Sequence, residues 1–285
     1  MSSFITASGL SLFDAAYLGE SGGAWWVGVV RRAPAGSAMP LDLGIRLGTK
    51  RQLRDLYRDP TGGLWVAGEG GVRRNRAPWG PDADLWEQQE LDAELHGITG
   101  VSETCVLVRG IRQSDGLHVL RHYNGARWNP IGTPEIEIAD MCLSGPTRIW
   151  IAGDGVARWN GEGWDVLNTG SMIGIAAPTD DRVVALREDG SFGRITPEGF
   201  DFLGHVPGAR TIAIWQDRIW IGAADGGLFR AGGGNLECVR PDRHCVSLEA
   251  HPEGMMIGCT DLVSSTVDGE RFPGGCRGTL DGLRL

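Results

Sequence analysis

Long apolar runs are missing from this 285-residue chain. A helix that crosses a bilayer needs about 20 consecutive apolar residues, and no stretch approaches that length. Residues 1–9 have neither a basic start nor a long apolar core, so we expect no secretory signal and a cytoplasmic location. The sequence therefore indicates a protein that works without inserting into a membrane.

Motifs of common enzymes and cofactor sites are missing as well. There is no Gly-x-Ser-x-Gly elbow, no phosphate loop, no His-Glu-x-x-His and no calcium loop. His118 and His122 are four residues apart, which on a strand separates them by about 13 Å, too far to share a metal. We expect no catalytic residues, no cofactor and no metal, and we favour a protein that is not an enzyme.

Lysine is nearly absent. Of the 27 lysine and arginine residues, all except Lys50 are arginine. The formal net charge of −9 argues against a nucleic-acid partner. Acidic residues are concentrated in segment 82–103, which has no lysine or arginine. They are Asp82, Asp84, Glu87, Glu90, Asp92, Glu94 and Glu103.

The six cysteines form no Cys-x-x-Cys pair, so they show no zinc-knuckle spacing. Most lie in apolar, strand-like runs, and buried thiols are the favoured interpretation. A disulfide or a zinc site among the four C-terminal cysteines stays open. These are Cys238, Cys245, Cys259 and Cys276.

Glycine and tryptophan are abundant, with 45 and 11 residues against only 3 tyrosines. This composition favours many short strands joined by tight turns. Three segments repeat the pattern of a Trp-containing strand, an acidic Gly turn and a second strand: 63–72 (GLWVAGEGGV), 148–156 (RIWIAGDGV) and 218–228 (RIWIGAADGGL). Weaker copies at 24–28, 104–108, 182–186 and 254–258 bring the total to seven.

Hairpin turns give the period of this repeat. Asn124-Gly125 and Asn160-Gly161 are 36 residues apart, and Asp268-Gly269 follows 108 residues later, which is three further periods. A period of this length with about four strands per unit predicts an all-β, seven-bladed β-propeller of four-stranded antiparallel blades, forming a single domain over 1–285. The predicted blades are approximately 10–48, 49–95, 96–132, 133–169, 170–204, 205–241 and 242–285.

The innermost strand of a blade is expected just before each Trp strand. The predicted inner strands are 12–18, 52–58, 136–143, 173–177, 211–215 and 246–250. Segment 3–8 precedes the first of them, and an open sheet edge must be avoided where the first and last blades meet. We therefore expect segment 3–8 to complete the last blade and close the ring.

The repeated Leu/Ile-Trp-Ile/Val-Ala/Gly strand, followed by a Gly turn and by Trp-Asn-Gly-x-x-Trp as at 159–164, resembles the two-component-regulator propeller repeats of bacterial sensor proteins. The resemblance covers about five units well. In that family the propeller is fused to a membrane helix and a kinase, and this chain shows neither. The resemblance thus implies a stand-alone binding module, since a fold alone does not carry an activity.

Acidic residues on the predicted inner strands are candidates for a site in the central channel. Asp55 and Asp140 each lie ten residues before the Trp of their blade, and Glu249 lies on the equivalent strand of the last unit. They are suited to binding a cation or a polar ligand. The favoured alternative is that they accept hydrogen bonds from the backbone of the neighbouring inner strand.

The acidic insertion is the second candidate site. Trp79 and Trp86 lie beside or within it, and together with Asp82, Asp84, Glu87 and Glu90 they suggest an anchor for a basic protein partner. The alternative is a solvated outer strand with both indole rings packed between blades.

We favour a monomeric protein-binding scaffold, such as an accessory subunit or an immunity protein that neutralises a toxin. A lectin-like or small-ligand propeller is the first alternative, and it predicts several exposed Trp residues at equivalent blade positions. A lyase or hydrolase is the second, and it predicts that Asp55, Asp140 and a histidine converge.

Overall fold

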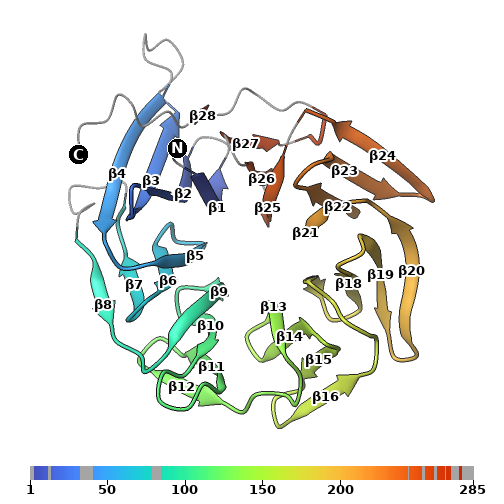
Figure 1. The fold of residues 1–285 in the computed structure, drawn as a ribbon, viewed down its shortest axis with the longest axis horizontal. Helices are drawn as coiled ribbons and strands as arrows, with labels where there is room; N and C mark the ends of the chain where they lie inside the picture. The colour runs from blue at the N-terminus through green and yellow to red at the C-terminus, as the bar shows by residue number, and fades with distance from the viewer. Residues whose placement is uncertain are drawn as a thin grey trace.

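The structure is a computed structural model that describes residues 3–11, 14–32, 41–78, 85–242, 244–251, 254–259, 262–266, 268–270 and 276–277. These residues form strands, turns and loops, and they include no helix that could span a membrane. Figure 1 shows the sheets arranged one after another around a central axis. The prediction of an all-β fold built from four-stranded antiparallel sheets is confirmed.

Within the described residues the strands form seven four-stranded sheets, numbered here in chain order. The first contains β1 (Ser3–Ser11), β2 (Asp14–Ser21), β3 (Ala24–Arg32) and β4 (Leu41–Thr49). The second contains β5 (Leu53–Arg58), β6 (Leu64–Gly68), β7 (Gly71–Asn75) and β8 (Glu87–Gln89). The third contains β9 (Glu94–Ser102), β10 (Cys105–Ile111), β11 (His118–Tyr123) and β12 (Trp128–Ile131).

The fourth sheet contains β13 (Ile138–Gly145), β14 (Arg148–Gly153), β15 (Val156–Trp159) and β16 (Trp164–Leu167). The fifth contains β17 (Gly174–Thr179), β18 (Arg182–Leu186), β19 (Ser191–Thr196) and β20 (Gly199–His205). The sixth contains β21 (Ala209–Trp215), β22 (Arg218–Ala223), β23 (Gly227–Gly232) and β24 (Asn235–Arg240). The seventh contains β25 (Cys245–His251), β26 (Gly254–Cys259), β27 (Leu262–Thr266) and β28 (Cys276–Arg277).

Each sheet runs outward from the centre in chain order, so that its first strand lies innermost and its fourth lies at the periphery (Figure 1). The predicted inner strands 52–58, 136–143, 173–177, 211–215 and 246–250 overlap β5, β13, β17, β21 and β25. The third sheet supplies β9 as its inner strand.

The prediction that segment 3–8 completes the last blade is wrong. β1 pairs with β2 inside the first sheet, where Phe4 lies opposite Gly19 and Ser11 opposite Asp14. Segment 12–18 is consequently not an inner strand, and its described part belongs to β2. The tight connection from Ser11 to Asp14 favours this local hairpin, because closing a short loop loses less chain entropy than pairing opposite ends of the chain.

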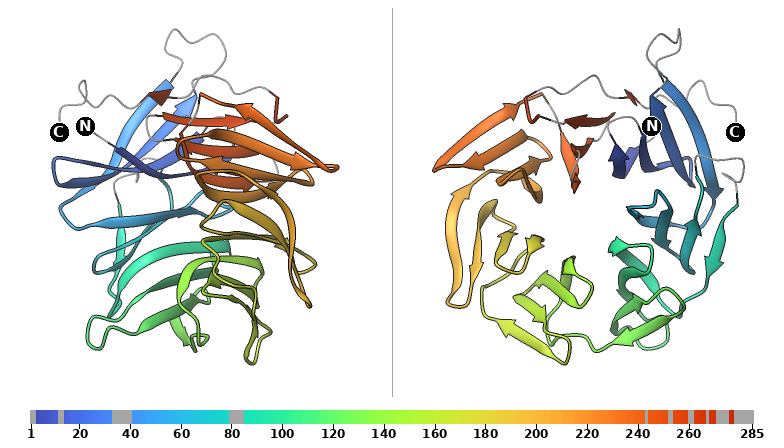
Figure 2. Two further views of the ribbon diagram at one scale, coloured as in Figure 1. Left: turned by 45° about the vertical axis from the view of Figure 1, so that its right-hand side comes forward. Right: turned by 180° about the vertical axis from the view of Figure 1, so that it is seen from behind.

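The first and last sheets nevertheless lie side by side. β1 contacts both β25 and β26, and the view from behind in Figure 2 shows the same adjacency. The last sheet takes its fourth strand from β28, near the C-terminus, and shares none with the first.

The repeated Trp strand is explained by two packing constraints. The first concerns the glycine three residues after the Trp, at Gly68 and Gly153, to which Gly110 corresponds in the third sheet, where Leu107 takes the place of the Trp. A Cβ at Gly153 would overlap the carbonyl oxygen of Glu137, which precedes the inner strand of the same sheet. A Cβ at Gly68 would meet the carbonyl oxygen of Gln52, just before β5, and one at Gly110 would meet that of Glu94, the first residue of β9.

The second constraint is a stack between neighbouring strands. The Arg74 guanidinium lies 4.2 Å from the centre of the Trp65 ring, and these two residues are register partners on β7 and β6. The same cross-strand pair recurs as Arg158 over Trp150 at 5.7 Å and Arg230 over Trp220 at 5.6 Å. The indole rings are buried, so they serve as core and carry the arginine stems on one face.

Gly153→Ala tests the close approach in the fourth sheet. We expect it to lower the free energy of unfolding by about 2–3 kcal/mol, because the new methyl group must displace backbone. Gly132→Ala is the matched control, since a Cβ there meets nothing within 4 Å, and its effect is expected to stay within about 0.5 kcal/mol. Urea denaturation of both variants gives the comparison, and equal stabilities would contradict the packing described here.

Candidate functional site: the central cavity

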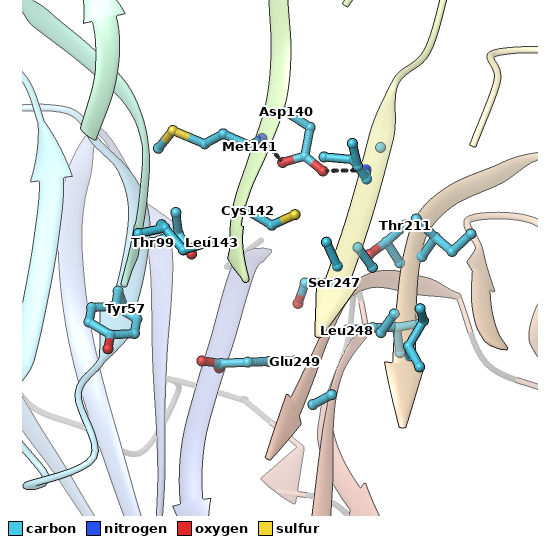
Figure 3. A pocket seen from close by; sticks show the side chains of 18 of the residues that line it. Tyr57, Thr99, Asp140, Met141, Cys142, Leu143, Thr211, Ser247, Leu248 and Glu249 are labelled. Atoms are coloured by element: carbon cyan, nitrogen blue, oxygen red, sulfur yellow. Dashed lines mark hydrogen bonds between the residues drawn. The ribbon is translucent and has the colours of Figure 1, made fainter. Parts of the chain in front are cut away.

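A cavity of ≈ 570 Å³ lies at the centre of the molecule, walled by the inner strands. Its described lining comes from β5, β9, β13, β17, β21 and β25. Figure 3 shows part of this wall, with polar groups from five different sheets on view. They are Tyr57, Thr99, Asp140, Cys142, Thr211, Ser247 and Glu249.

Asp140 links the fourth sheet to the fifth. Its Oδ1 accepts a hydrogen bond of 2.8 Å from the backbone N–H of Met141, and its Oδ2 accepts one of 2.9 Å from that of Ile175 on β17 (Figure 3). Both carboxylate oxygens are thus engaged by main-chain donors, one of them on the neighbouring inner strand.

Asp55 repeats this arrangement between the second and third sheets. Its Oδ1 accepts from the N–H of Leu56 at 2.8 Å, and its Oδ2 accepts from the N–H of Ile98 on β9 at 2.9 Å. Both carboxylates therefore bond the backbone of a neighbouring inner strand, which is the interpretation favoured from the sequence.

Arg109 makes the link between the third and fourth sheets, and sequence reasoning missed it. From β10, its Nη1 donates to the carbonyl oxygen of Ile138 at 3.2 Å. Its register partner on the inner strand is Gly97, where a Cβ would come within 2.8 Å of Arg109 Nε. The glycine leaves the space that the arginine side chain occupies.

A pattern along the inner strands underlies these three links. Asp55, Gly97, Asp140 and Gly174 occupy one equivalent position, as their register partners in the second strands show. Aspartate thus alternates with glycine, and each aspartate bonds the residue that follows the next sheet's glycine. An arginine at position 109, where the second and fourth sheets have Ala67 and Ala152, was the available sequence signal for the third link.

Burial controls the charge state of these carboxylates. Burial raises the pKa of Asp55 to about 7, although the backbone donors Ile98 and Leu56 and the charge of Arg109 act in the opposite direction. Burial likewise raises the pKa of Asp140, against the bond from Ile175 and the charge of Arg109. The charge of Asp140 adds to the upward shift at Asp55, so the two groups sense each other.

Glu249 stands apart from this pair. It lies half-buried on β25, and Figure 3 shows it on the cavity wall away from Asp140. The pKa of Tyr57 is raised first by burial and then by the charges of Asp59 and Glu249. The three predicted channel acids thus line one cavity, and two of them, Asp55 and Asp140, each bond the backbone of the next inner strand.

The arrangement expected of a lyase or hydrolase is not formed by the described residues. No histidine lines the cavity among them, and the two aspartates that would act with it are bonded to main-chain N–H groups. No group of three or more His, Cys, Asp or Glu side chains in the described part of the chain is placed to hold a metal ion. The lectin-like alternative expected exposed Trp residues at equivalent positions, whereas Trp65, Trp150 and Trp220 are buried.

The acidic insertion is only partly within the described residues, because Trp79, Asp82 and Asp84 lie outside them. Trp86 is half-buried against the apolar cluster that contains Leu18 and Leu56. Glu87 pairs with Arg76 at 2.9 Å, while Glu90 is exposed.

Arginines of the second sheet also bind the other end of the acidic segment. Glu94 pairs with Arg54 at 2.9 Å and Glu103 with Arg74 at 3.0 Å. Three of the carboxylates are therefore matched within the molecule, which the run of acids in the sequence does not reveal.

No protein-family model matches the chain, and no curated protein matches its sequence. Solved structures do match. The WD40 propeller domain of Doa1 superposes with a TM-score of 0.72 at 10% identity, covering 90% of each chain. The chain folds as a β-propeller.

Two further propellers illustrate how far this similarity extends. YCF48 bound to D1 peptide gives a TM-score of 0.58 at 14% identity, covering 82% of this chain and 83% of that one. Virginiamycin B lyase from Staphylococcus aureus gives 0.62 at 12% identity, covering 91% and 96%. At these identities the likeness concerns the fold, and the resemblance to sensor propeller repeats stays a prediction.

Asp140→Ala tests the link between the fourth and fifth sheets of the propeller. Removing the carboxylate leaves the N–H groups of Ile175 and Met141 without this acceptor, so we expect a loss of about 1–3 kcal/mol in unfolding free energy. Asp201→Ala, at an exposed aspartate on β20, is the control and is expected to change stability by less than about 0.5 kcal/mol. Chemical denaturation measures both, and a neutral Asp140→Ala would remove this link from the account.

The pKa of Asp55 predicts a pH dependence of stability. Because the folded-state pKa of about 7 lies above the ordinary value of 3.8, the stabilising contribution is full below pH 3.8 and is lost as pH rises through 7. The stability of the wild type relative to Asp55→Asn should thus fall between pH 4 and 7, by at most about 1.4 kcal/mol per pH unit. Parallel urea titrations at several pH values measure this difference, and a flat or rising difference would show that the carboxyl does not titrate as described.

Proposed function

We propose that this propeller is a non-enzymatic protein-binding scaffold that forms a closed seven-bladed ring. WD40 propellers, to which it is structurally similar, generally serve as scaffolds for binding other proteins. YCF48, a propeller of similar fold, has been solved with a bound peptide. The observation that carries the proposal is a groove between two neighbouring sheets, with exposed leucines among its lining residues.

The groove lies between the fifth and sixth sheets and has a volume of ≈ 610 Å³. Its apolar lining includes Phe192 on β19, Ile214 on β21 and Ile219 on β22. Charged residues line it as well, namely Asp181, Arg182, Arg194 and Asp217, and Arg182 pairs with Asp217. Leu203 and Leu236 line it from β20 and β24, the outermost strands of the two sheets (Figure 1).

Large apolar side chains are exposed around this groove. The exposed fraction is 41% for Leu203 and 44% for Leu236, and Phe202, next to Leu203, reaches 60%. Exposed apolar side chains beside a concave groove are typical of protein interaction sites. The central cavity offers less to a partner, because its two aspartates already bind backbone.

The charge of the chain supports a basic partner. The net charge of −9 favours encounter with a positively charged protein. Glu90 and Asp92 are exposed in the acidic segment and add to this field, and the neighbouring Leu85 is 66% exposed. In this proposal the partner is a basic protein that seats apolar side chains in the groove, and the propeller acts as an accessory or toxin-neutralising protein in the cytoplasm.

The double variant Leu203→Glu with Leu236→Glu tests the groove. We expect it to weaken capture of the partner from a lysate of the native host by about tenfold or more, since buried apolar anchors dominate interface energy. Quantitative mass spectrometry of proteins retained by wild type and variant measures the change.

Leu85→Glu is the matched control, because it places the same charge at another exposed leucine outside the groove. It is expected to leave capture unchanged. A partner lost with Leu85→Glu but kept by the groove variant would move the interface to the acidic segment. A set of bound proteins insensitive to both variants would argue against the scaffold function.

A further inference from the structure

Two cysteines of the last sheet face each other across neighbouring strands. Cys245 begins β25 and Cys259 ends β26, and they are direct register partners. Their Sγ atoms are 3.8 Å apart, and both residues are fully buried. Cys105, Cys142 and Cys238 belong to β10, β13 and β24 in three other sheets, and Cys276 lies on β28 of the last sheet.

The surroundings of the pair fix it in place. Cys245 and Cys259 pack in an apolar cluster with Trp220, Met255 and Ile257. A Cβ on Gly222 of the sixth sheet would lie 2.8 Å from the Cβ of Cys245. Since the sulfurs lie opposite each other at 3.8 Å, small side-chain rotations bring them within bonding distance.

Burial controls the reactivity of the two thiols. Apolar surroundings favour the neutral thiol over the thiolate, which is the form of cysteine that reacts with oxidants. The Arg240 guanidinium, at the end of β24 in the neighbouring sheet, is held by two hydrogen bonds of 2.9 Å to Asp242. The pair is therefore expected to react when the last sheet opens locally and water reaches the sulfurs.

We propose that Cys245 and Cys259 are a redox pair that forms a cross-strand disulfide when the protein meets a hydroperoxide. One thiolate attacks a peroxide oxygen and becomes a sulfenic acid, and with hydrogen peroxide the other oxygen leaves as water after taking up a proton. The second thiol then attacks the sulfenic sulfur, forming the S–S bond and releasing a second water. Two thiols and one hydrogen peroxide thus give one disulfide and two waters.

The bond affects the sheet that lies beside the first one. β25 and β26 contact β1 of the first sheet, with which the last sheet shares no strand. A disulfide closes the 15-residue segment 245–259 and restricts the unfolded chain, so it stabilises this sheet. Because both sulfurs are buried, the oxidant must enter through local opening of the last sheet, and the reaction is expected to be slow.

Oxidation of the reduced, full-length protein with hydrogen peroxide tests the proposal. We expect the intact mass to fall by two hydrogens, the number of thiols measured after denaturation to fall by two, and non-reducing peptide mapping to join Cys245 to Cys259. The melting temperature should rise by on the order of 5 °C and return to its starting value with dithiothreitol.

Cys259→Ala should abolish the mass change and the thermal shift, while Cys142→Ala, in another sheet, should retain both. If Cys259→Ala does not fold, the non-reducing peptide map of the oxidised wild type shows whether Cys245 is joined to Cys259. Oxidation of either residue to a sulfinic acid, a mapped disulfide to a different cysteine, or two unreacted thiols under peroxide would overturn the proposal.

Discussion

Hydrogen bonds between side chains and main chain join neighbouring sheets at the centre of the molecule. In each case a side chain on the first or second strand of one sheet bonds the main chain of the next sheet's inner strand. Separate sheets share no backbone ladder, so side chains must supply the directional contacts between them. Asp55 bonds Ile98, Arg109 bonds the carbonyl of Ile138, and Asp140 bonds Ile175. The alternation of aspartate and glycine leaves room for each link, and the order of the second to fifth sheets depends on it.

These hydrogen bonds also limit the chemistry that side chains of the central cavity can perform. A carboxylate that accepts two main-chain hydrogen bonds is fixed in orientation, and it is a poor candidate for moving protons to a substrate. Burial raises the pKa of both aspartates, but here a raised pKa accompanies a structural role, as buried structural groups also show perturbed pKa values. In the proposed function, the exposed leucines beside the groove contact the partner, and these two aspartates serve the structure.

The sequence predicted the repeated features and missed the irregular ones. Trp65, Trp150 and Trp220 recur because each ring must fill the same space beneath an arginine of the next strand, and such periodic constraints leave a periodic pattern. The pairing of β1 was mispredicted because it depends on competition between a local hairpin and the far end of the chain. The arginine partners of Glu87, Glu94 and Glu103 were not predicted, because the paired residues are 11, 40 and 29 positions apart in the sequence and no local pattern joins them.

The position of β1 changes how stability is distributed around the ring. In a repeat architecture each unit is stabilised mainly by its neighbours, and no two of the described sheets share a strand, so side chains make the contacts at every junction. The described part of the last sheet ends with β28, whose two residues pair with Leu262 and Val263 of β27. Separating β28 from β27 therefore breaks few backbone hydrogen bonds, whereas separating the fourth and fifth sheets breaks the bond from Ile175 to Asp140.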